Sequence, residues 1–308
     1  MIKINQISKS FGSFQALKSL SLEVKKGEFY SLLGPNGAGK TTCINIISKI
    51  MPATSGTVEI AGLKSHNKAD EIKKKIGVVP QEIALYDDLS AVENLLFWGK
   101  INSVETNKLK SKIHEILKFL DLHKQKNNKI STYSGGMKRR INIAAALLHE
   151  PEVLFMDEPT VGIDPQSKLF IYEIFEKLHK QGKTIFYTSH NMEEVERLSD
   201  RIGIIDHGQL IAEGSLSELK EKLKLEETLV ITTEKPLDDE IFKTIKTHFP
   251  NTIKKDLQLL VSTKNSNDDL AWMFKTFDKN EIQISSIEIQ KVNLEMIFLK
   301  LTGKKLRE

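Results

Sequence analysis

Residues 34–41 read Gly34-Pro35-Asn36-Gly37-Ala38-Gly39-Lys40-Thr41, which fits the pattern G-x-x-x-x-G-K-[ST]. An apolar run at 28–33 predicts a strand before them, and residues 40–50 predict a helix after them. Glycines let successive backbone N–H groups face a polyphosphate, and the helix start adds the positive end of its dipole. A glycine-rich turn that arose by chance is the alternative. The context favours a phosphate-binding loop, with Lys40 on the β- and γ-phosphates and Thr41 on Mg²⁺.

A second acidic motif follows another apolar run, in Val153-Leu154-Phe155-Met156-Asp157-Glu158. A buried parallel strand here would deliver both carboxylates to the edge of the sheet where ligands collect. We expect Asp157 to hold Mg²⁺, directly or through water, and Glu158 to polarise an attacking water. By itself the motif is weak, because many strands end in solvated acidic residues.

The segment Tyr133-Ser134-Gly135-Gly136-Met137 precedes the acidic strand and opens a predicted helix. Together with the two motifs above, it makes the chain resemble the ABC ATPases, whose signature is usually Leu-Ser-Gly-Gly-Gln. This sequence departs from that signature at Tyr133 and Met137 and keeps its Ser-Gly-Gly centre. A serine and glycine N–H groups at a helix start form a second phosphate-binding surface. The resemblance implies that the signature of one subunit closes on the ATP of another, in a homodimer or with a paired ATPase subunit.

The resemblance carries over to four further residues, each of which has a plain structural alternative. Phe11 matches the aromatic residue that stacks on adenine, and Gln81 matches the glutamine that reaches Mg²⁺ and water and begins the loop facing a membrane partner. Asp164 matches the loop that crosses the dimer interface, although it also fits a helix N-cap before Pro165. His190 matches the histidine that contacts the γ-phosphate.

The expected site therefore has three groups of residues, for ATP, for Mg²⁺ and for catalysis. The nucleotide-binding residues are Phe11, Gly34, Pro35, Asn36, Gly37, Ala38, Gly39, Lys40, Thr41, Thr42, Ser134, Gly135, Gly136 and Asp164. The metal-binding residues are Thr41, Gln81 and Asp157, and the catalytic residues are Glu158, His190 and Gln81.

Composition fits an ordinary globular protein, with 40% hydrophobic and 28% charged residues. The 45 basic and 41 acidic residues are too balanced to favour nucleic acid, which we do not expect as a partner. The single cysteine, Cys43, excludes an internal disulfide and indicates the cytoplasm. No signal peptide is apparent, and no stretch approaches the roughly 18 apolar residues of a spanning helix. A transport pore would therefore belong to another polypeptide, an integral membrane permease, with this chain peripheral on its cytoplasmic side.

Periodicity divides the chain into a large α/β domain at 1–220 and a small α+β domain at 225–308. In the first, we also predict strands at 2–7 and 184–188, a helix at 165–180 and two short strands around the turn His207-Gly208. The resemblance implies that the first is a P-loop NTPase fold, the ABC cassette, with an antiparallel β subdomain and a helical subdomain at about 87–148. In the second, we predict strands at 228–233, 257–262 and 282–289 and helices at 237–249, 267–277 and 294–301, an alternation typical of a ferredoxin-like unit. We interpret Lys138-Arg139-Arg140 as a solvated helix face.

The final residues, 295–303, resemble the ends of daunorubicin-resistance-type bacterial export ATPases, the type-2 exporters. This implies an ATP-hydrolysing exporter subunit that powers a separate permease through ATP-driven dimerisation. Two alternatives stay open: an ABC ATPase that drives a non-transport membrane machine for motility or envelope remodelling, and a soluble ATPase acting on nucleic acid or ribosomes. The second domain is a candidate for dimerisation, regulation or partner contact, or it only stabilises the chain.

Overall fold

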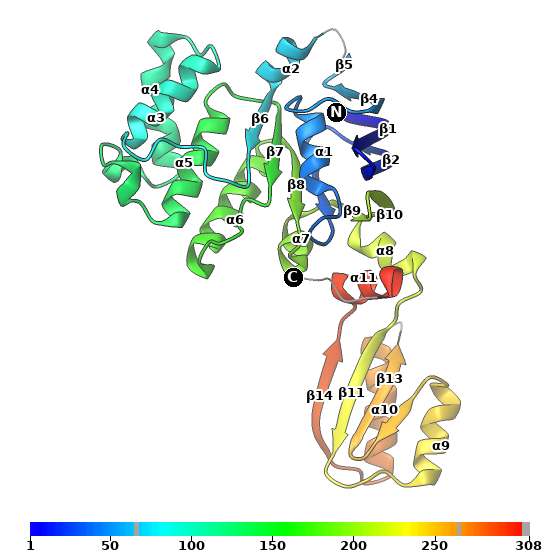
Figure 1. Cartoon of the computed structure of the whole chain (residues 1–308). Coiled ribbons are helices and arrows are strands. Elements are labelled where there is room, and N and C mark those ends of the chain that lie inside the picture. The colour runs from blue at the N-terminus through cyan, green and yellow to red at the C-terminus, as the bar shows by residue number, and fades with distance from the viewer. Residues whose placement is uncertain (65–67, 264–265, 304–308) are drawn as a thin grey trace. The chain divides into compact units, whose positions relative to one another are not determined.

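The computed structural model describes residues 1–64, 68–263 and 266–303. The chain divides into two compact units, of which the first contains Met1–Leu216 and the second begins at Ser217 (Figure 1). No helix in these three ranges combines the length and the apolar character needed to cross a membrane.

A six-stranded sheet forms the centre of the first unit, in the order β10-β9-β3-β8-β7-β6. Its strands are β3 (Phe29–Leu33), β6 (Ile76–Val79), β7 (Val153–Asp157), β8 (Thr184–Ser189), β9 (Arg201–Asp206) and β10 (Gln209–Gly214). All neighbours pair in parallel except β10 and β9, which form the hairpin predicted at His207-Gly208. Every residue of β3, β7 and β8 is buried, in line with the largely apolar sequences of these strands. The loops after these three strands therefore meet at one edge of the sheet.

Three helices complete the layers on this sheet, namely α1 (Lys40–Ile47), α6 (Pro165–Lys180) and α7 (Met192–Leu198). The bounds of α6 match the prediction, and Asp164 caps it by accepting a hydrogen bond from the backbone N–H of Ser167 at 2.9 Å. The sequence analysis did not anticipate α7, a short helix capped by Asn191.

An antiparallel sheet, in the order β2-β1-β4-β5, forms the β subdomain. Its strands are β1 (Ile2–Phe11), β2 (Phe14–Val24), β4 (Ser55–Ile60) and β5 (Leu63–Lys64). The strand predicted to end at Ile7 continues to Phe11, because pairing with β2 extends beyond the clear alternation of apolar residues. The extra length forms a hairpin that carries Phe11 and Phe14 at its tip.

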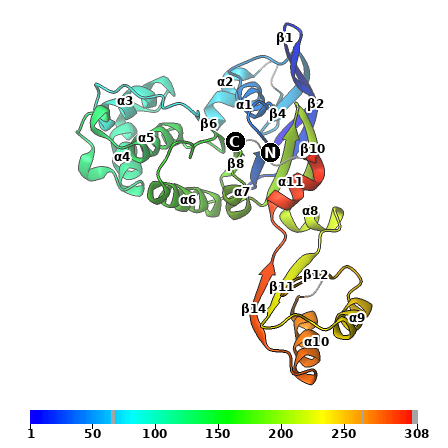
Figure 2. The same ribbon diagram turned by 60° about the horizontal axis from the view of Figure 1, so that its bottom comes forward.

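Helices form the subdomain at the β6 edge of the central sheet, on the side away from β1 and β2 (Figures 1 and 2). The short helix α2 (Ala69–Lys75) precedes β6 and packs its buried Ile72 into a different core, with β1, β2 and β4. The helices of the subdomain are α3 (Ala91–Ile101), α4 (Thr106–Phe119) and α5 (Gly135–Leu147), with 3-10 turns at His123–Gln125 and Ile130–Thr132. Ser90 and Glu93 form a capping box that starts α3. The apolar faces of these helices share one core with β7 and α6.

The interpretation of Lys138-Arg139-Arg140 as a solvated face is wrong. Arg139 is only 3% exposed, and its guanidinium donates to the carbonyl oxygens of Pro80, at 2.6 Å, and Gln81. Arg140 is half-buried and donates to the carbonyl oxygen of Leu120 at 3.0 Å. The physical reason is that these two guanidinium groups donate to main-chain carbonyl oxygens from distant parts of the sequence. The periodicity of apolar residues does not reveal such contacts.

The second unit contains a β-α-β-β-α-β alternation with the strand order β12-β13-β11-β14, all paired antiparallel. This is the ferredoxin-like arrangement. Its elements are α8 (Leu216–Lys222), β11 (Glu227–Thr233), α9 (Asp239–His248), β12 (Ile253–Lys255), β13 (Gln258–Thr263), α10 (Ser266–Lys279), β14 (Ile284–Gln290) and α11 (Leu294–Thr302). The predicted elements are present, and β12 was missed because three largely exposed residues carry no apolar pattern.

Candidate functional site

The phosphate loop joins β3 to α1 and depends on glycine at its last turn. Gly39 is the N-cap residue of α1, and its φ of 106° is one that residues with a side chain rarely adopt. A Cβ atom at this position would lie 2.7 Å from the carbonyl oxygen of Ala16. Gly37 also has a positive φ, of 80°. Ala38 between them is buried, so it presents only its backbone to a ligand.

Lys40 lies inside the curl of this loop and is almost fully buried. Its ammonium donates to the carbonyl oxygens of Gly34, at 2.7 Å, and Pro35, at 3.0 Å. Its Nζ also lies 3.0 Å from Oε1 of Glu158, which is equally buried. A buried positive charge enclosed by backbone groups and one carboxylate is suited to contact a polyphosphate, which supplies several charged acceptor oxygens.

The two acidic residues at the end of β7 have different surroundings. Asp157 accepts a hydrogen bond from the hydroxyl of Thr188, on β8, at 2.6 Å, and a second one from the side chain of Thr41. Burial raises the pKa of Asp157, an effect that these two hydrogen bonds oppose. Carboxylate and hydroxyl oxygens are the ligands that hard cations prefer, so Asp157 and Thr41 together fit Mg²⁺.

Glu158 follows with a φ of 43°, in the left-handed region. Its backbone N–H donates to the carbonyl oxygen of Thr188 at 3.1 Å, which stabilises the turn at the end of the strand. The turn directs the carboxylate between Lys40 and His190, whose Nδ1 lies 3.0 Å from Oε2 of Glu158. Three residues far apart in the sequence, Lys40, Glu158 and His190, thus form one connected polar cluster.

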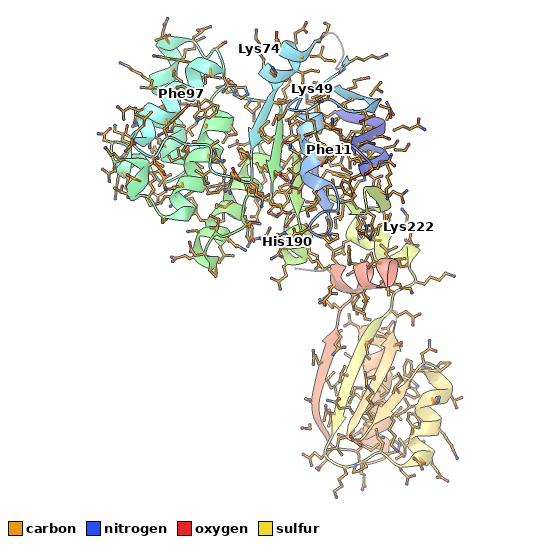
Figure 3. All side chains as sticks on the ribbon, in the orientation of Figure 1. Phe11, Lys49, Lys74, Phe97, His190 and Lys222 are labelled. Atoms are coloured by element: carbon orange, nitrogen blue, oxygen red, sulfur yellow. The ribbon has the colours of Figure 1, made fainter. Side chains whose placement is uncertain are left out.

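A cavity of about 320 Å³ lies beside this cluster. Its lining residues are Phe11, Phe14, Ala16, Asn36, Gly37, Gly39, Lys40, Thr41, Thr42, Gln81 and Glu158. Phe11, labelled in Figure 3, and Phe14 come from the β1–β2 hairpin, and their side chains are 47% and 62% exposed. Aromatic rings at one end and the phosphate loop at the other suit a nucleotide, whose base and phosphates have opposite polarity.

Several predicted nucleotide-binding residues are not among those that line this cavity, namely Gly34, Pro35 and Ala38 of the phosphate loop, the signature residues Ser134, Gly135 and Gly136, and Asp164. Ser134 caps α5, accepting a hydrogen bond from the N–H of Met137 at 3.3 Å, and Gly135 and Gly136 begin the helix. A Cβ at Gly136 would lie 3.7 Å from Oδ2 of Asp164. The signature and Asp164 therefore form a surface of their own on the same unit.

Sequence reasoning missed Thr188, Phe14 and a buried carboxylate, Glu194. Glu194 is 3% exposed and accepts hydrogen bonds from Thr160 and Ser189, which precede Asp164 and His190 in the chain. One available signal was its position beside Val195 and four residues before Leu198, on what proves to be the buried face of α7.

Comparisons with known proteins give a consistent result. The ABC transporter family model matches residues 17–161. The chain is 42% identical to a linearmycin resistance ATP-binding protein of Bacillus subtilis (strain 168), with 100% of both proteins covered. It is 31% identical to a daunorubicin resistance ATP-binding protein of Streptomyces coeruleorubidus, over 98% of this chain and 96% of that protein. The predicted resemblance to resistance-type ABC ATPases is thereby confirmed.

A solved structure supports the same assignment. It is a dimeric ATP-binding cassette in a post-hydrolysis state bound to ADP and phosphate, which superposes with a TM-score of 0.63 at 30% identity. The match covers 70% of this chain and 99% of that cassette. The predicted fold class, an α/β ABC cassette followed by a small α+β domain, is confirmed. The chain therefore belongs to the ABC transporter family and is an ATP-binding, ATP-hydrolysing subunit.

Proposed function

We propose that this chain powers a bacterial exporter, in which it pairs with a second ATPase subunit and drives a separate membrane permease from its cytoplasmic face. The observation that carries the proposal is the presence of two nucleotide-type surfaces on one unit. One is the cavity at Lys40, and the other is the helix start at Ser134 and Gly136, whose residues are absent from the cavity lining. A head-to-tail pair of subunits would use both surfaces of each chain. Resistance relatives support export as the purpose.

The cluster at the end of β7 would carry the chemistry of hydrolysis. Glu158 would orient and polarise the attacking water, and His190, 3.0 Å from its carboxylate, would contact the γ-phosphate. Thr41, Asp157 and Gln81 would hold Mg²⁺, which supplies charge neutralisation on the phosphates when bound. Lys40 would exchange its backbone carbonyl contacts for phosphate oxygens. The phenyl ring of Phe11 would stack on the adenine.

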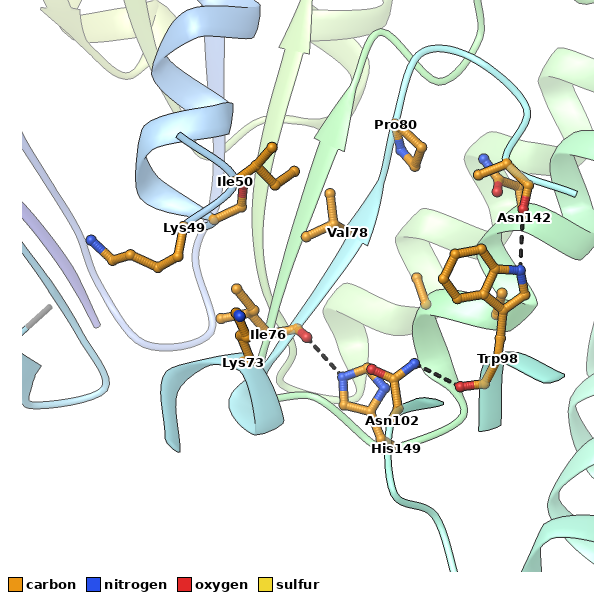
Figure 4. Close-up of a pocket in the computed structure, with 14 residues that line it drawn as sticks. Lys49, Ile50, Lys73, Ile76, Val78, Pro80, Trp98, Asn102, Asn142 and His149 are labelled. Atoms are coloured by element: carbon orange, nitrogen blue, oxygen red, sulfur yellow. Dashed lines mark hydrogen bonds between the residues drawn. The ribbon is translucent and has the colours of Figure 1, made fainter. Parts of the chain in front are cut away.

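A groove between α1, β6, α3 and α5 is the proposed contact with the permease (Figure 4). Its volume is about 490 Å³, and apolar residues such as Ile50, Val78 and Trp98 line it. This largely apolar lining suits an apolar segment of the permease.

The location of this groove supports the coupling. Pro80 lies in its wall, and the next residue, Gln81, lines the nucleotide cavity. A segment of the permease in the groove would therefore contact the loop that also reaches the nucleotide. A transporter needs such an arrangement, because ATP binding and hydrolysis must change the conformation of the membrane partner.

The test of the catalytic and dimerisation proposals uses Glu158→Gln in the full chain. We expect ATP binding to persist, turnover to fall by on the order of 10²–10⁴, and a stable ATP-dependent dimer to accumulate on gel filtration. Adding Gly135→Asp, which places a carboxylate at the signature where a Cβ would meet nothing closer than 3.8 Å, should abolish that dimer without removing ATP binding. Turnover near the wild-type rate in Glu158→Gln would refute the catalytic role, and a monomer with ATP bound would refute the pairing.

The permease contact is tested by co-purification with a candidate membrane protein encoded beside this chain. Ile50→Glu should weaken recovery of the complex because it places a charge in the apolar lining of the groove. Ile101→Glu, the same change at an exposed isoleucine outside the groove lining, is the control. Equal recovery of both variants would contradict the groove as the docking site.

A further inference from the structure

The loop from Pro80 to Ser90 is held largely by side chains of the helical subdomain. From α3, Trp98 donates through Nε1 to the carbonyl oxygen of Ala84 at 3.1 Å, and Asn94 donates to the carbonyl oxygen of Tyr86 at 3.0 Å. From α5, Lys138 forms an ion pair with Asp87 at 2.7 Å. The loop leaves the central sheet at the end of β6 but is bonded to α3 and α5.

Arg139, also on α5, makes the contact nearest to the nucleotide cavity. Its two terminal nitrogens donate to consecutive carbonyl oxygens, those of Pro80 and Gln81. The guanidinium is 3% exposed, and burial lowers its pKa to about 10, so it stays charged at neutral pH. Leaving such a buried charge without acceptors is costly, whereas its planar fork matches two adjacent carbonyls. The two carbonyls and the guanidinium therefore fix one another.

The position of Arg139 along α5 connects the loop to the signature residues at the start of this helix. The helix begins with the signature glycines, Gly135 and Gly136, and Arg139 lies one turn further on. Its acceptors include the backbone of Gln81, whose residue lines the nucleotide cavity. A displacement of α5 must therefore displace Gln81 as well, unless the fork of hydrogen bonds breaks.

We propose that Arg139 is a positioning residue that clamps the backbone of Gln81 to the signature helix, so that the metal contact of Gln81 and the placement of the signature change together. The proposal rests on the metal role given to Gln81 in the proposed function. Arg139 touches neither nucleotide nor metal in this scheme. It acts through the main chain of residues 80 and 81.

The experiment is a Mg²⁺ titration of the full chain at saturating ATP, followed both as ATPase activity and as the rise in melting temperature that Mg²⁺ produces. Arg139→Met removes the donors and keeps an unbranched side chain. Arg139→Lys keeps the charge but lacks the planar fork. Arg140→Met is the matched control, because Arg140 is the next residue on α5 and donates to Leu120, which is outside the loop.

We expect Arg139→Met to raise the half-saturating Mg²⁺ concentration by about tenfold, the scale of one lost hydrogen bond to a charged group. Arg139→Lys should give a smaller rise. Arg140→Met should stay within about twofold of the wild type, because the hydrogen bond that it removes goes to Leu120, outside the loop. A purely structural role would lower thermal stability without moving the Mg²⁺ dependence. Equal Mg²⁺ dependence in Arg139→Met and Arg140→Met would overturn the proposal. If Arg139→Met does not fold, the same comparison with Arg139→Lys decides it.

Gln81→Ala separates this proposal from the proposed function. If Gln81→Ala leaves the Mg²⁺ dependence unchanged, the metal role of Gln81 is refuted, and the clamp, which rests on that role, is refuted with it. If Gln81→Ala shifts the dependence and neither Arg139 variant does, the metal role stands and the clamp is refuted. If both shift it, the double variant should be no worse than Gln81→Ala alone, and additive effects would contradict the clamp.

Discussion

Replacing Glu194 by alanine should be among the most destabilising single changes in the first unit. Its carboxylate accepts from the hydroxyls of Thr160, at 2.8 and 2.9 Å, Tyr172, at 2.8 Å, Tyr187, at 2.7 Å, and Ser189, at 3.1 Å. Glu194 is 3% exposed, so water cannot replace these contacts. Alanine would leave four hydroxyl groups without their shared acceptor.

The size of the effect follows from the number and kind of these contacts. A hydrogen bond to a charged group contributes about 1.5–3 kcal/mol, but contributions within one network are not additive and some hydroxyls will find new partners. Lys168 lies 3.6 Å from Glu194 and would lose its counter-charge. Breaking a buried charged network by removing one partner costs about 3–5 kcal/mol. We therefore expect a loss of about 3–5 kcal/mol, or roughly 6–20 °C in the melting temperature of a unit of this size.

The assay is urea denaturation followed by tryptophan fluorescence. The chain has two tryptophans. Trp98 lies in the first unit and Trp272 in the second. In a Trp272→Phe background, the signal therefore reports the first unit alone. Glu193→Ala is the matched control, because Glu193 is the neighbouring glutamate of α7 and is exposed.

The expected result is a large shift for Glu194→Ala and a shift of about 0.5 kcal/mol or less for Glu193→Ala. Tyr172→Phe, which removes one donor, should cost about 1–2 kcal/mol. A loss for Glu194→Ala that equals the loss for Glu193→Ala would refute the reasoning, since the network would then contribute no net stability.

Three further predictions concern the site. Asp157→Asn should raise the melting temperature at pH 7. Burial raises the pKa of the Asp157 carboxyl, so its ionised form destabilises the folded state. The difference in melting temperature should disappear as the pH falls below about 3.8, where the acid is protonated in both the folded and the unfolded state. Cys43 is buried, and burial raises the pKa of its thiol to about 12, so at pH 8 about one thiol in ten thousand is ionised. A thiol reagent should therefore modify Cys43 only after the chain unfolds in urea. Rapid modification of the native chain would contradict its burial. Gly136→Ala would place a Cβ 2.2 Å from the hydroxyl oxygen of Ser167, so the start of α5 must move away from α6 and ATPase activity should fall. Adding Ser167→Gly in the same chain should restore part of the activity. Activity unchanged by Gly136→Ala alone would show that α5 and α6 are not closely packed there.

Local patterns predicted much of the fold and the chemical groups of the site. The strand endings at Leu33 and Asp157, the glycine turn before Lys40 and the helix at Pro165–Lys180 are encoded by neighbouring residues. Backbone conformation and the side chains that a strand end presents depend mostly on such neighbours, so these predictions needed no tertiary information. The roles assigned to these residues in binding and catalysis stay predictions.

The elements that were missed or misjudged depend on distant partners. The strand at Ile253–Lys255 exists because it pairs with β13, and the last four residues of β1 are ordered by β2. Arg139 was interpreted as exposed because its helix has charged residues at three successive positions. Its acceptors, the carbonyl oxygens of Pro80 and Gln81, are 59 and 58 residues away.

By itself, the sequence determined that the chain has a phosphate loop, an acidic strand end and a signature helix, because each is a short run with a local conformational preference. Only the tertiary structure decided that Lys40 and His190 flank one carboxylate, Glu158, and that Arg139 and Glu194 are buried. The reason is physical: a charged side chain can be buried only where donors or acceptors from other elements converge on it. That convergence is a property of the packed sheet and helices, which no single stretch of sequence contains.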